Sequence, residues 1–296
     1  MGEFAALGTS IFWSFTSMLF TVAGRRVGSV VVNRTRLVIA VLFISTAHIL
    51  LYGELVPEGT NQIRLFWLGL SGVIGLVLGD AFLFQAFVML GPRIPMLLMA
   101  LTPVISTILA WVFLGERLSS LDLMAVLIAV GGVSWVVWES NTQQNGMNRK
   151  NYLSGVLYGL GGALGQALGL ITSKKGLEGG FPPLSAVLLR MSIAMIVIWI
   201  VALFQRQARS TINALKDRMV FRAIVGASIC GPFLGVWLSL IAIEQTQIGI
   251  ASTLMSLAPI FLIPLTRWFF KEQISGRVVF GTITALVGVT MIFLTP

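Results

Sequence analysis

The sequence predicts an all-α integral membrane protein of ten transmembrane helices, arranged as two inverted five-helix repeats. Hydrophobic residues make up 56% of the 296 positions, charged residues only 10%, and the mean hydropathy is +0.93. A soluble globular protein carries roughly 25% charged residues, so most of this surface has to face lipid. Two further observations support this fold class: the chain contains a series of separate apolar spans, and its two halves match each other.

The ten apolar spans mostly approach the roughly 20 residues that cross the hydrocarbon core of a bilayer. Lipid offers the backbone no hydrogen-bond partners, so each span is predicted to be a helix. Their pattern is not the alternation of a membrane barrel. Most gaps are very short, which indicates that neighbouring helices pack antiparallel. The spans are residues 4–24, 32–52, 64–89, 93–114, 121–138, 152–173, 184–204, 220–243, 248–270 and 276–294.

Two longer polar segments interrupt this series of spans. Residues 139–151 (ESNTQQNGMNRKN) fall near the middle of the chain and are predicted to link an N-terminal repeat, 1–138, to a C-terminal repeat, 152–296. Residues 205–219 (QRQARSTINALKDRM) form a basic loop with the character of a surface helix.

The two halves match when the chain is shifted by 156 residues, which aligns Pro103 with Pro259 and Gly132 with Gly288. Five is an odd number, so two consecutive five-helix units enter the membrane in opposite senses. The repeats are therefore predicted to be inverted. This plan is common in secondary transporters, whose solute site lies near the midplane between the halves.

The net charge of +9 comes from 20 Lys and Arg residues that lie almost entirely in the gaps between spans. About 15 of them flank the gaps after spans 1, 3, 5, 7 and 9, which the positive-inside rule places in the cytoplasm, with both termini outside. Orientation and anionic headgroups explain this distribution, so no nucleic-acid partner is expected. The single cysteine, Cys230, excludes an internal disulfide.

Asp80 lies within the third span, in the segment GLVLGDAFLFQAF. A charged carboxylate at that depth costs about 2.5–3.5 kcal/mol on insertion scales, so it should face the bundle interior and have a partner. We interpret it as a candidate for proton coupling or for binding a substrate ammonium group. The alternative is a structural ion pair or a hydrogen bond to helix backbone.

The first span carries four hydroxyl side chains, Ser10, Ser14, Ser17 and Thr21, whose spacing places them on one helical face. Trp13 lies beside this stripe. We predict that Trp13, Ser14 and Ser17 line a solute cavity, with the indole as a stacking surface. The alternative is helix–helix packing, where small hydroxyl residues are common.

Proline interrupts the fourth and ninth spans near their middles, at Pro103 and Pro259. Each proline removes a backbone donor and frees a carbonyl one turn earlier, near Met99 and Met255. The kinks are candidate hinges and the methionines are candidate solute contacts, although both features are also ordinary in membrane helices.

Glycines crowd the sixth span (SGVLYGLGGALGQALG), where they favour close helix contact. Gln166 lies in the same segment and is a candidate cavity residue. Phe84 and Ser256 complete the predicted set of solute-binding residues.

The remaining polar residues favour structural roles. Arg36 and Arg190 open the second span of each half, and anchoring at lipid headgroups is favoured over contact with an anionic group. His48 is the only histidine, so no metal site and no cofactor are expected.

Several motifs together carry a family resemblance over residues 4–294. FLGERLS at 113–119 follows the proline-centred helix LTPVISTILAWVFLGE, and the second half repeats this plan as LAPIFLIPLTRWFFKEQIS, with Lys271 in place of the glycine before Glu272. With Trp13 and Arg36, these segments resemble the EamA family of the drug/metabolite transporter superfamily. The resemblance implies a ten-helix bundle with a central cavity and secondary transport, often export, of small metabolites, without implying one substrate.

The combined hypothesis is a multi-pass protein of a bacterial or archaeal inner membrane that moves a small, amino-acid-like solute by alternating access, with proton antiport through Asp80. No phosphate-binding loop or ATPase domain is present in the sequence. The partners expected are the solute and membrane lipid, and the state is a monomer or homodimer. The alternatives are translocation of a lipid or lipid carrier, and a membrane-embedded lipid-modifying enzyme, which scattered acids and one histidine disfavour.

Overall fold

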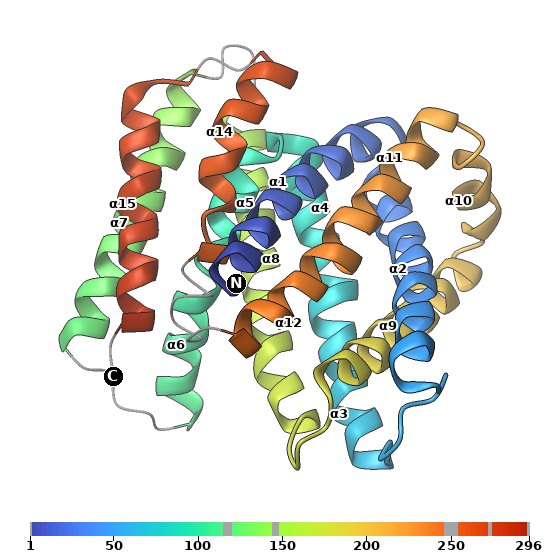
Figure 1. The fold of residues 1–296 in the computed structure, drawn as a ribbon. Coiled ribbons are helices and arrows are strands. Elements are labelled where there is room, and N and C mark those ends of the chain that lie inside the picture. Colours follow the sequence, from blue (N-terminus) through green and yellow to red (C-terminus); the bar gives the residue numbers. More distant parts are fainter. Residues whose placement is uncertain (1, 115–119, 144–147, 246–253, 272–273, 295–296) are drawn as a thin grey trace.

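The structure, a computed structural model, describes residues 2–114, 120–143, 148–245, 254–271 and 274–294. All regular secondary structure in these ranges is helical, as the sequence predicts (Figure 1). The elements are α1 (Gly2–Val27), α2 (Ser29–Tyr52), α3 (Gln62–Gly72), the π-helical η1 (Val73–Gly79), α4 (Asp80–Leu90), α5 (Arg93–Met99), α6 (Thr102–Leu114), α7 (Ser120–Gln143), α8 (Arg149–Gly176), α9 (Pro183–Phe204), α10 (Ala208–Ala214), α11 (Arg218–Ser228), the π-helical η2 (Ile229–Gly235), α12 (Val236–Gln245), α14 (Ala258–Phe269) and α15 (Gly276–Leu294).

Within the described ranges, 7 helices are long and apolar enough to cross a membrane. Three shorter apolar helices, Arg93–Ser106, Ala258–Phe269 and Gly276–Met291, fall inside the other predicted spans. The count of ten stays a prediction, because part of the ninth span lies outside the described residues. The basic loop at 205–219 contains the short helix α10, in agreement with its predicted character.

Two long helices contain a π-helical segment of seven residues each, η1 between α3 and α4 and η2 between α11 and α12. Val73 and Ile229 begin these segments, and they are 156 positions apart. The same separation holds between the first residues of α7 and α15, Ser120 and Gly276. The offset found in the sequence therefore recurs in the positions at which helices begin.

The two prolines of the fourth and ninth spans lie at helix starts, which differs from the kinks expected in mid-helix. Pro103 is the second residue of α6, after a turn that follows α5, and Pro259 is the second residue of α14. The first helical turn has no intrahelical partner for its N–H groups, so proline is tolerated there and a new helix begins. Each span is thus broken rather than bent.

Helices α7 and α15 pack side by side at one edge of the molecule (Figure 1). A Cβ atom added at Gly132 would lie 2.7 Å from the Cα of Ala285, and one added at Gly288 would lie 2.7 Å from the Cα of Ala129. These reciprocal glycine contacts let the two backbones approach closely, which is a common way for membrane helices to associate.

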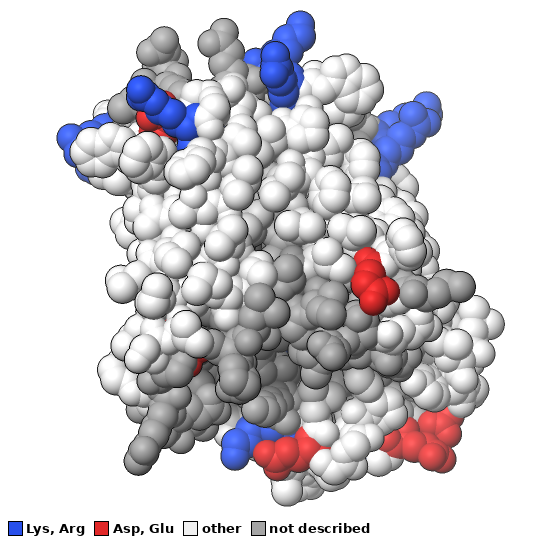
Figure 2. Space-filling model, turned by 60° about the vertical axis from the view of Figure 1, so that its left-hand side comes forward, with Lys and Arg blue, Asp and Glu red and all other residues white. Residues whose placement is uncertain are grey.

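On the face shown in Figure 2, most of the visible Lys and Arg side chains lie at one end of the molecule, and acidic side chains with one basic group lie at the other. At the basic end, the carboxylate of Asp217 caps α11 by accepting hydrogen bonds from Met219 N at 2.9 Å and Val220 N at 3.3 Å. Arg26, at the end of α1, donates to the same carboxylate at 3.1 Å. These contacts join α1 to α11 outside the membrane-spanning segments.

Candidate functional site

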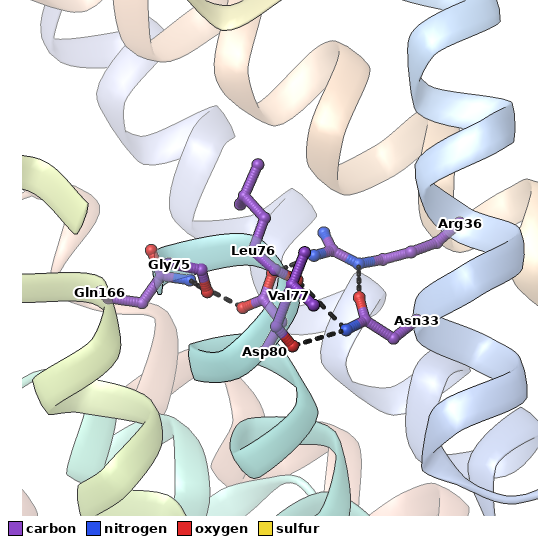
Figure 3. A network of polar contacts seen from close by, with 7 residues as sticks. All are labelled: Asn33, Arg36, Gly75, Leu76, Val77, Asp80 and Gln166. Carbon is purple, nitrogen blue, oxygen red and sulfur yellow. Dashed lines mark hydrogen bonds and ion pairs between the residues drawn. The ribbon is translucent and has the colours of Figure 1, made fainter. Parts of the chain in front are cut away.

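Asp80 begins α4, directly after η1, and its carboxylate joins three helices (Figure 3). One carboxylate oxygen, Oδ2, forms an ion pair and a hydrogen bond with Nη2 of Arg36 on α2. The other, Oδ1, accepts a hydrogen bond of 2.7 Å from Nε2 of Gln166 on α8. Asp80 is 4% exposed and Arg36 is 5% exposed, so the pair is shielded from solvent. The sequence-based expectation that Asp80 faces inward and has a partner is confirmed.

Arg36 was expected to anchor at lipid headgroups, and the structure contradicts this. Helix α2 begins at Ser29, earlier than predicted, so Arg36 lies two turns inside the helix. Its Nε donates to Oδ1 of Asn33 at 3.1 Å, and its guanidinium lies over the ring of Phe84, 4.9 Å from the centroid. These contacts fix the guanidinium in place beside Asp80.

Asn33 also contacts the π-helical segment. Its Nδ2 donates to the carbonyl oxygens of Leu76 at 3.1 Å and Val77 at 3.3 Å (Figure 3). A π-helical segment interrupts the regular ladder of helical hydrogen bonds, and such segments are frequent at functional sites. Here the altered backbone presents carbonyl oxygens to the side chain that positions Arg36.

Glycines bring α8 close enough for Gln166 to reach Asp80. A Cβ atom added at Gly165 would lie 2.6 Å from the Cα of Gly79, and one added at Gly169 would lie 3.1 Å from the Cα of Gly75. Any larger residue would push the helices apart, so the interpretation of these glycines as a close helix contact is confirmed. Gln166 also donates to the Gly75 carbonyl at 3.3 Å.

Arg190 lies near this network without joining it by a hydrogen bond. It is the eighth residue of α9, as Arg36 is the eighth residue of α2, and it interacts electrostatically with both Asp80 and Arg36. Its Nε and Nη2 atoms are buried and have no hydrogen-bond partner among the described residues. Anchoring at headgroups does not fit these buried nitrogen atoms.

The hydroxyl stripe of α1 is buried, and its hydroxyl groups donate to main-chain oxygens. Ser14 Oγ donates to Ser10 O at 2.8 Å and to Ala258 O at 2.9 Å, at the start of α14. Ser17 Oγ donates to Ser14 O at 2.8 Å, and Thr21 Oγ1 to Ser17 O at 2.7 Å. These contacts match the alternative of helix packing, and the prediction that Ser14 and Ser17 line a cavity is not tested by them.

The predicted solute contacts fall into two groups. Phe84 packs with Phe20 and Phe87 beside the ion pair, and Met99 packs against the same cluster. Trp13 and Met255 belong to a separate cluster, in which the Trp13 indole lies against Gly235 of η2. Ser256 lies in the turn that precedes α14, half-buried.

Three residues in or beside the network were not among the predicted site residues: Asn33, Arg36 and, beside it, Arg190. The available signal was that charged residues inside membrane spans are rare and usually functional, and this applied to both arginines. Asn33 carried no comparable signal. His48 forms hydrogen bonds with Ser185 Oγ at 2.9 Å and with the Glu54 carbonyl at 2.7 Å, so its ring is held by local polar contacts.

The described part of the chain holds no group of three His, Cys, Asp or Glu residues that suits a metal ion. Chemically, the site offers a carboxylate that can accept a proton, two guanidinium groups and two amide side chains, all between membrane-spanning helices. Such a set can bind a charged solute and exchange a proton. The motif residues Glu116 and Glu272 lie outside the described residues.

A family model described as the EamA-like transporter family matches residues 1–138 and 153–294. A crystal structure of a protein with 16% sequence identity superposes over 98% of this chain and 95% of its own length, with a TM-score of 0.63, which shows a shared fold. A search of curated proteins finds no significant match.

Proposed function

Since the chain belongs to the EamA-like transporter family, we propose that it is a secondary transporter that moves a small organic solute across a cell membrane by alternating access. The observation that carries this proposal is the buried network around Asp80. An ionisable pair between membrane-spanning helices is expensive to bury, and such pairs mark solute and proton pathways. An aromatic ring and two amide side chains beside the pair suit a small zwitterionic or amphipathic solute.

Two inverted five-helix halves are part of the proposal. The family model matches one segment on each side of residues 139–152, and η2 and α15 in the second segment begin 156 positions after η1 and α7 in the first. In transporters built this way, one repeat rocks against the other around a fixed midplane site. The broken helices at Pro103 and Pro259 supply candidate hinges in equivalent places.

Proton coupling through Asp80 is the second part of the proposal. The ionised carboxylate holds α2 through Arg36 and α8 through Gln166. Protonation removes the charge that pairs with Arg36, so the contact between α2 and α4 weakens and the helices are free to rearrange. Inward movement of a proton then drives outward movement of the solute, which gives export.

Flux measurements in proteoliposomes test this proposal. Vesicles with purified protein are loaded with labelled amino acids, organic acids or amines, and release is measured with and without a pH gradient. We expect gradient-dependent release of at least one class from wild-type vesicles and loss of the gradient dependence in Asp80→Asn. The exposed loop residue Glu58 provides the control Glu58→Gln, which should behave as wild type. Release that never exceeds that of protein-free vesicles would refute transport.

A further inference from the structure

The guanidinium of Arg190 has one complete edge without a partner. Its Nε and Nη2 atoms are both buried and make no hydrogen bond to any described residue. The same edge of Arg36 is fully used, because Nε donates to Asn33 and Nη2 to Asp80. A buried donor without a partner carries its full desolvation cost, and a charged donor more than a neutral one. The two arginines occupy equivalent helix positions, but among the described residues the Nε and Nη2 donors have hydrogen-bond partners only in Arg36.

Two glycines lie beside the Nη2 atom of this edge. A Cβ atom added at Gly75 of η1 would lie 2.5 Å from Arg190 Nη2, and one added at Gly169 of α8 would lie 3.0 Å from it. Glycine at both positions makes room for the guanidinium between η1 and α8. The arrangement brings Arg190 near the Asp80 network, and no described residue accepts a hydrogen bond from its Nε or Nη2 atom.

The charges of the network do not balance. Each oxygen of Asp80 is already engaged, Oδ2 by Arg36 and Oδ1 by Gln166. The described groups in electrostatic contact are then one carboxylate and two guanidinium groups, with one positive charge in excess. An uncompensated cation inside a membrane protein destabilises the fold. One further anion would neutralise the site.

We propose that the Nε–Nη2 edge of Arg190 binds a carboxylate group of the transported solute. This inference rests on the proposed transport function and adds the class of solute. The two parallel N–H groups of such an edge match the two oxygens of a carboxylate, so one group satisfies both donors and the excess charge together. Amino acids and organic acids then fit the site, whereas amines and amides without a carboxylate do not.

Matched pairs of solutes test the carboxylate directly. Leucine and leucinamide, phenylalanine and phenylalaninamide, and benzoate and benzamide differ at the carboxyl group, and each is added at millimolar concentration to purified protein while the melting temperature is measured. In at least one pair, we expect the carboxylate to raise the melting temperature and the corresponding amide to leave it unchanged. Arg190→Met should weaken the binding of that carboxylate on the order of tenfold or more.

Three outcomes of this binding experiment overturn the inference. The first is a wild-type protein that no carboxylate stabilises, and the second is equal binding of carboxylate and amide. The third is a carboxylate that binds Arg190→Met as tightly as wild type. Flux of a solute without a carboxylate in the proteoliposome assay would leave the transport proposal standing and refute only the role of Arg190.

A second measurement does not depend on the choice of solute. In the absence of solute, Arg190→Met removes the excess positive charge and leaves the Arg36–Asp80 pair intact, so we expect its melting temperature to be higher than that of wild type. Arg36→Met breaks the pair and should lower it. A melting temperature that falls as much in Arg190→Met as in Arg36→Met would show that Arg190 is a structural residue, and the inference would fail.

Discussion

Substitution of Asp80 by asparagine should destabilise the protein more than substitution of its ion-pair partner. Asp80→Asn keeps an oxygen that accepts the hydrogen bond from Gln166, but it removes the one carboxylate that, among the described residues, interacts with both Arg36 and Arg190. Arg36→Met leaves Asp80 unpaired but still in electrostatic contact with Arg190. The ranking therefore follows from the excess of positive charge around one carboxylate.

The magnitudes follow from the contacts that each change removes. Breaking a buried ion pair by removing one partner costs about 3–5 kcal/mol, and we expect this range for Asp80→Asn. Arg36→Met loses a hydrogen bond to Asn33 and the contact over Phe84, but Arg190 offsets part of the charge, so its cost should be on the order of 2 kcal/mol. The double variant removes both charges of the pair, and its cost should fall short of the sum of the singles by about 1–3 kcal/mol.

Equilibrium unfolding in mixed detergent micelles measures these free energies for the four proteins of the cycle. Glu58→Gln, in an exposed loop, is the control and should lie within about 0.5 kcal/mol of wild type. The account of the ion pair would be refuted if the free-energy cost of the double variant equalled the sum of the costs of the two single variants. An Asp80→Asn variant as stable as Arg36→Met would also refute it, because the argument from charge excess would then be wrong.

Two further predictions concern packing and pH. Gly165→Ala should lower the melting temperature, because its Cβ would lie 2.6 Å from the Cα of Gly79, whereas Gly131→Ala, with nothing within 4 Å, should leave it unchanged or raise it; equal effects would contradict the close contact. Main-chain N–H groups of α11 hold the pKa of Asp217 below its ordinary value, so its stabilising contribution is present above the unfolded-state pKa and is lost as pH falls through the folded-state pKa. Melting temperatures measured against pH should therefore fall less steeply at acidic pH for Asp217→Asn, which caps the helix without titrating, and identical profiles would contradict this.

Helix positions were predictable because the bilayer fixes the length of an apolar span. The predicted span 184–204 became α9, Pro183–Phe204, and the span 276–294 became α15, Gly276–Leu294. The π-helical segments were not predictable, since no local composition marks them. Pro103 was correctly noted as an interruption, but the sequence does not distinguish a bent helix from one that ends and restarts.

The sequence predicted a site residue where burying its charge in the membrane costs free energy. It did not predict the site where the role depends on the direction in which a side chain points. A carboxylate in an apolar span requires a partner, so Asp80 was identified from the free-energy cost of placing its charge in the membrane. Arg36 was misjudged because its place near the start of a span suggested the membrane surface, and the side chain instead points into the bundle. The α1 hydroxyl stripe was placed on one face correctly, but whether that face meets a cavity or another helix depends on packing that periodicity does not report.

The central claim, that the Asp80 network couples solute movement to proton movement, is tested most directly by measuring both in the same vesicles. Proteoliposomes that contain a pH-sensitive dye are exposed to labelled carboxylate solutes, and solute flux and internal pH are followed together. The account predicts coupled changes for wild type, and solute exchange without proton movement for Asp80→Asn. Proton movement of wild-type size in Asp80→Asn would contradict it.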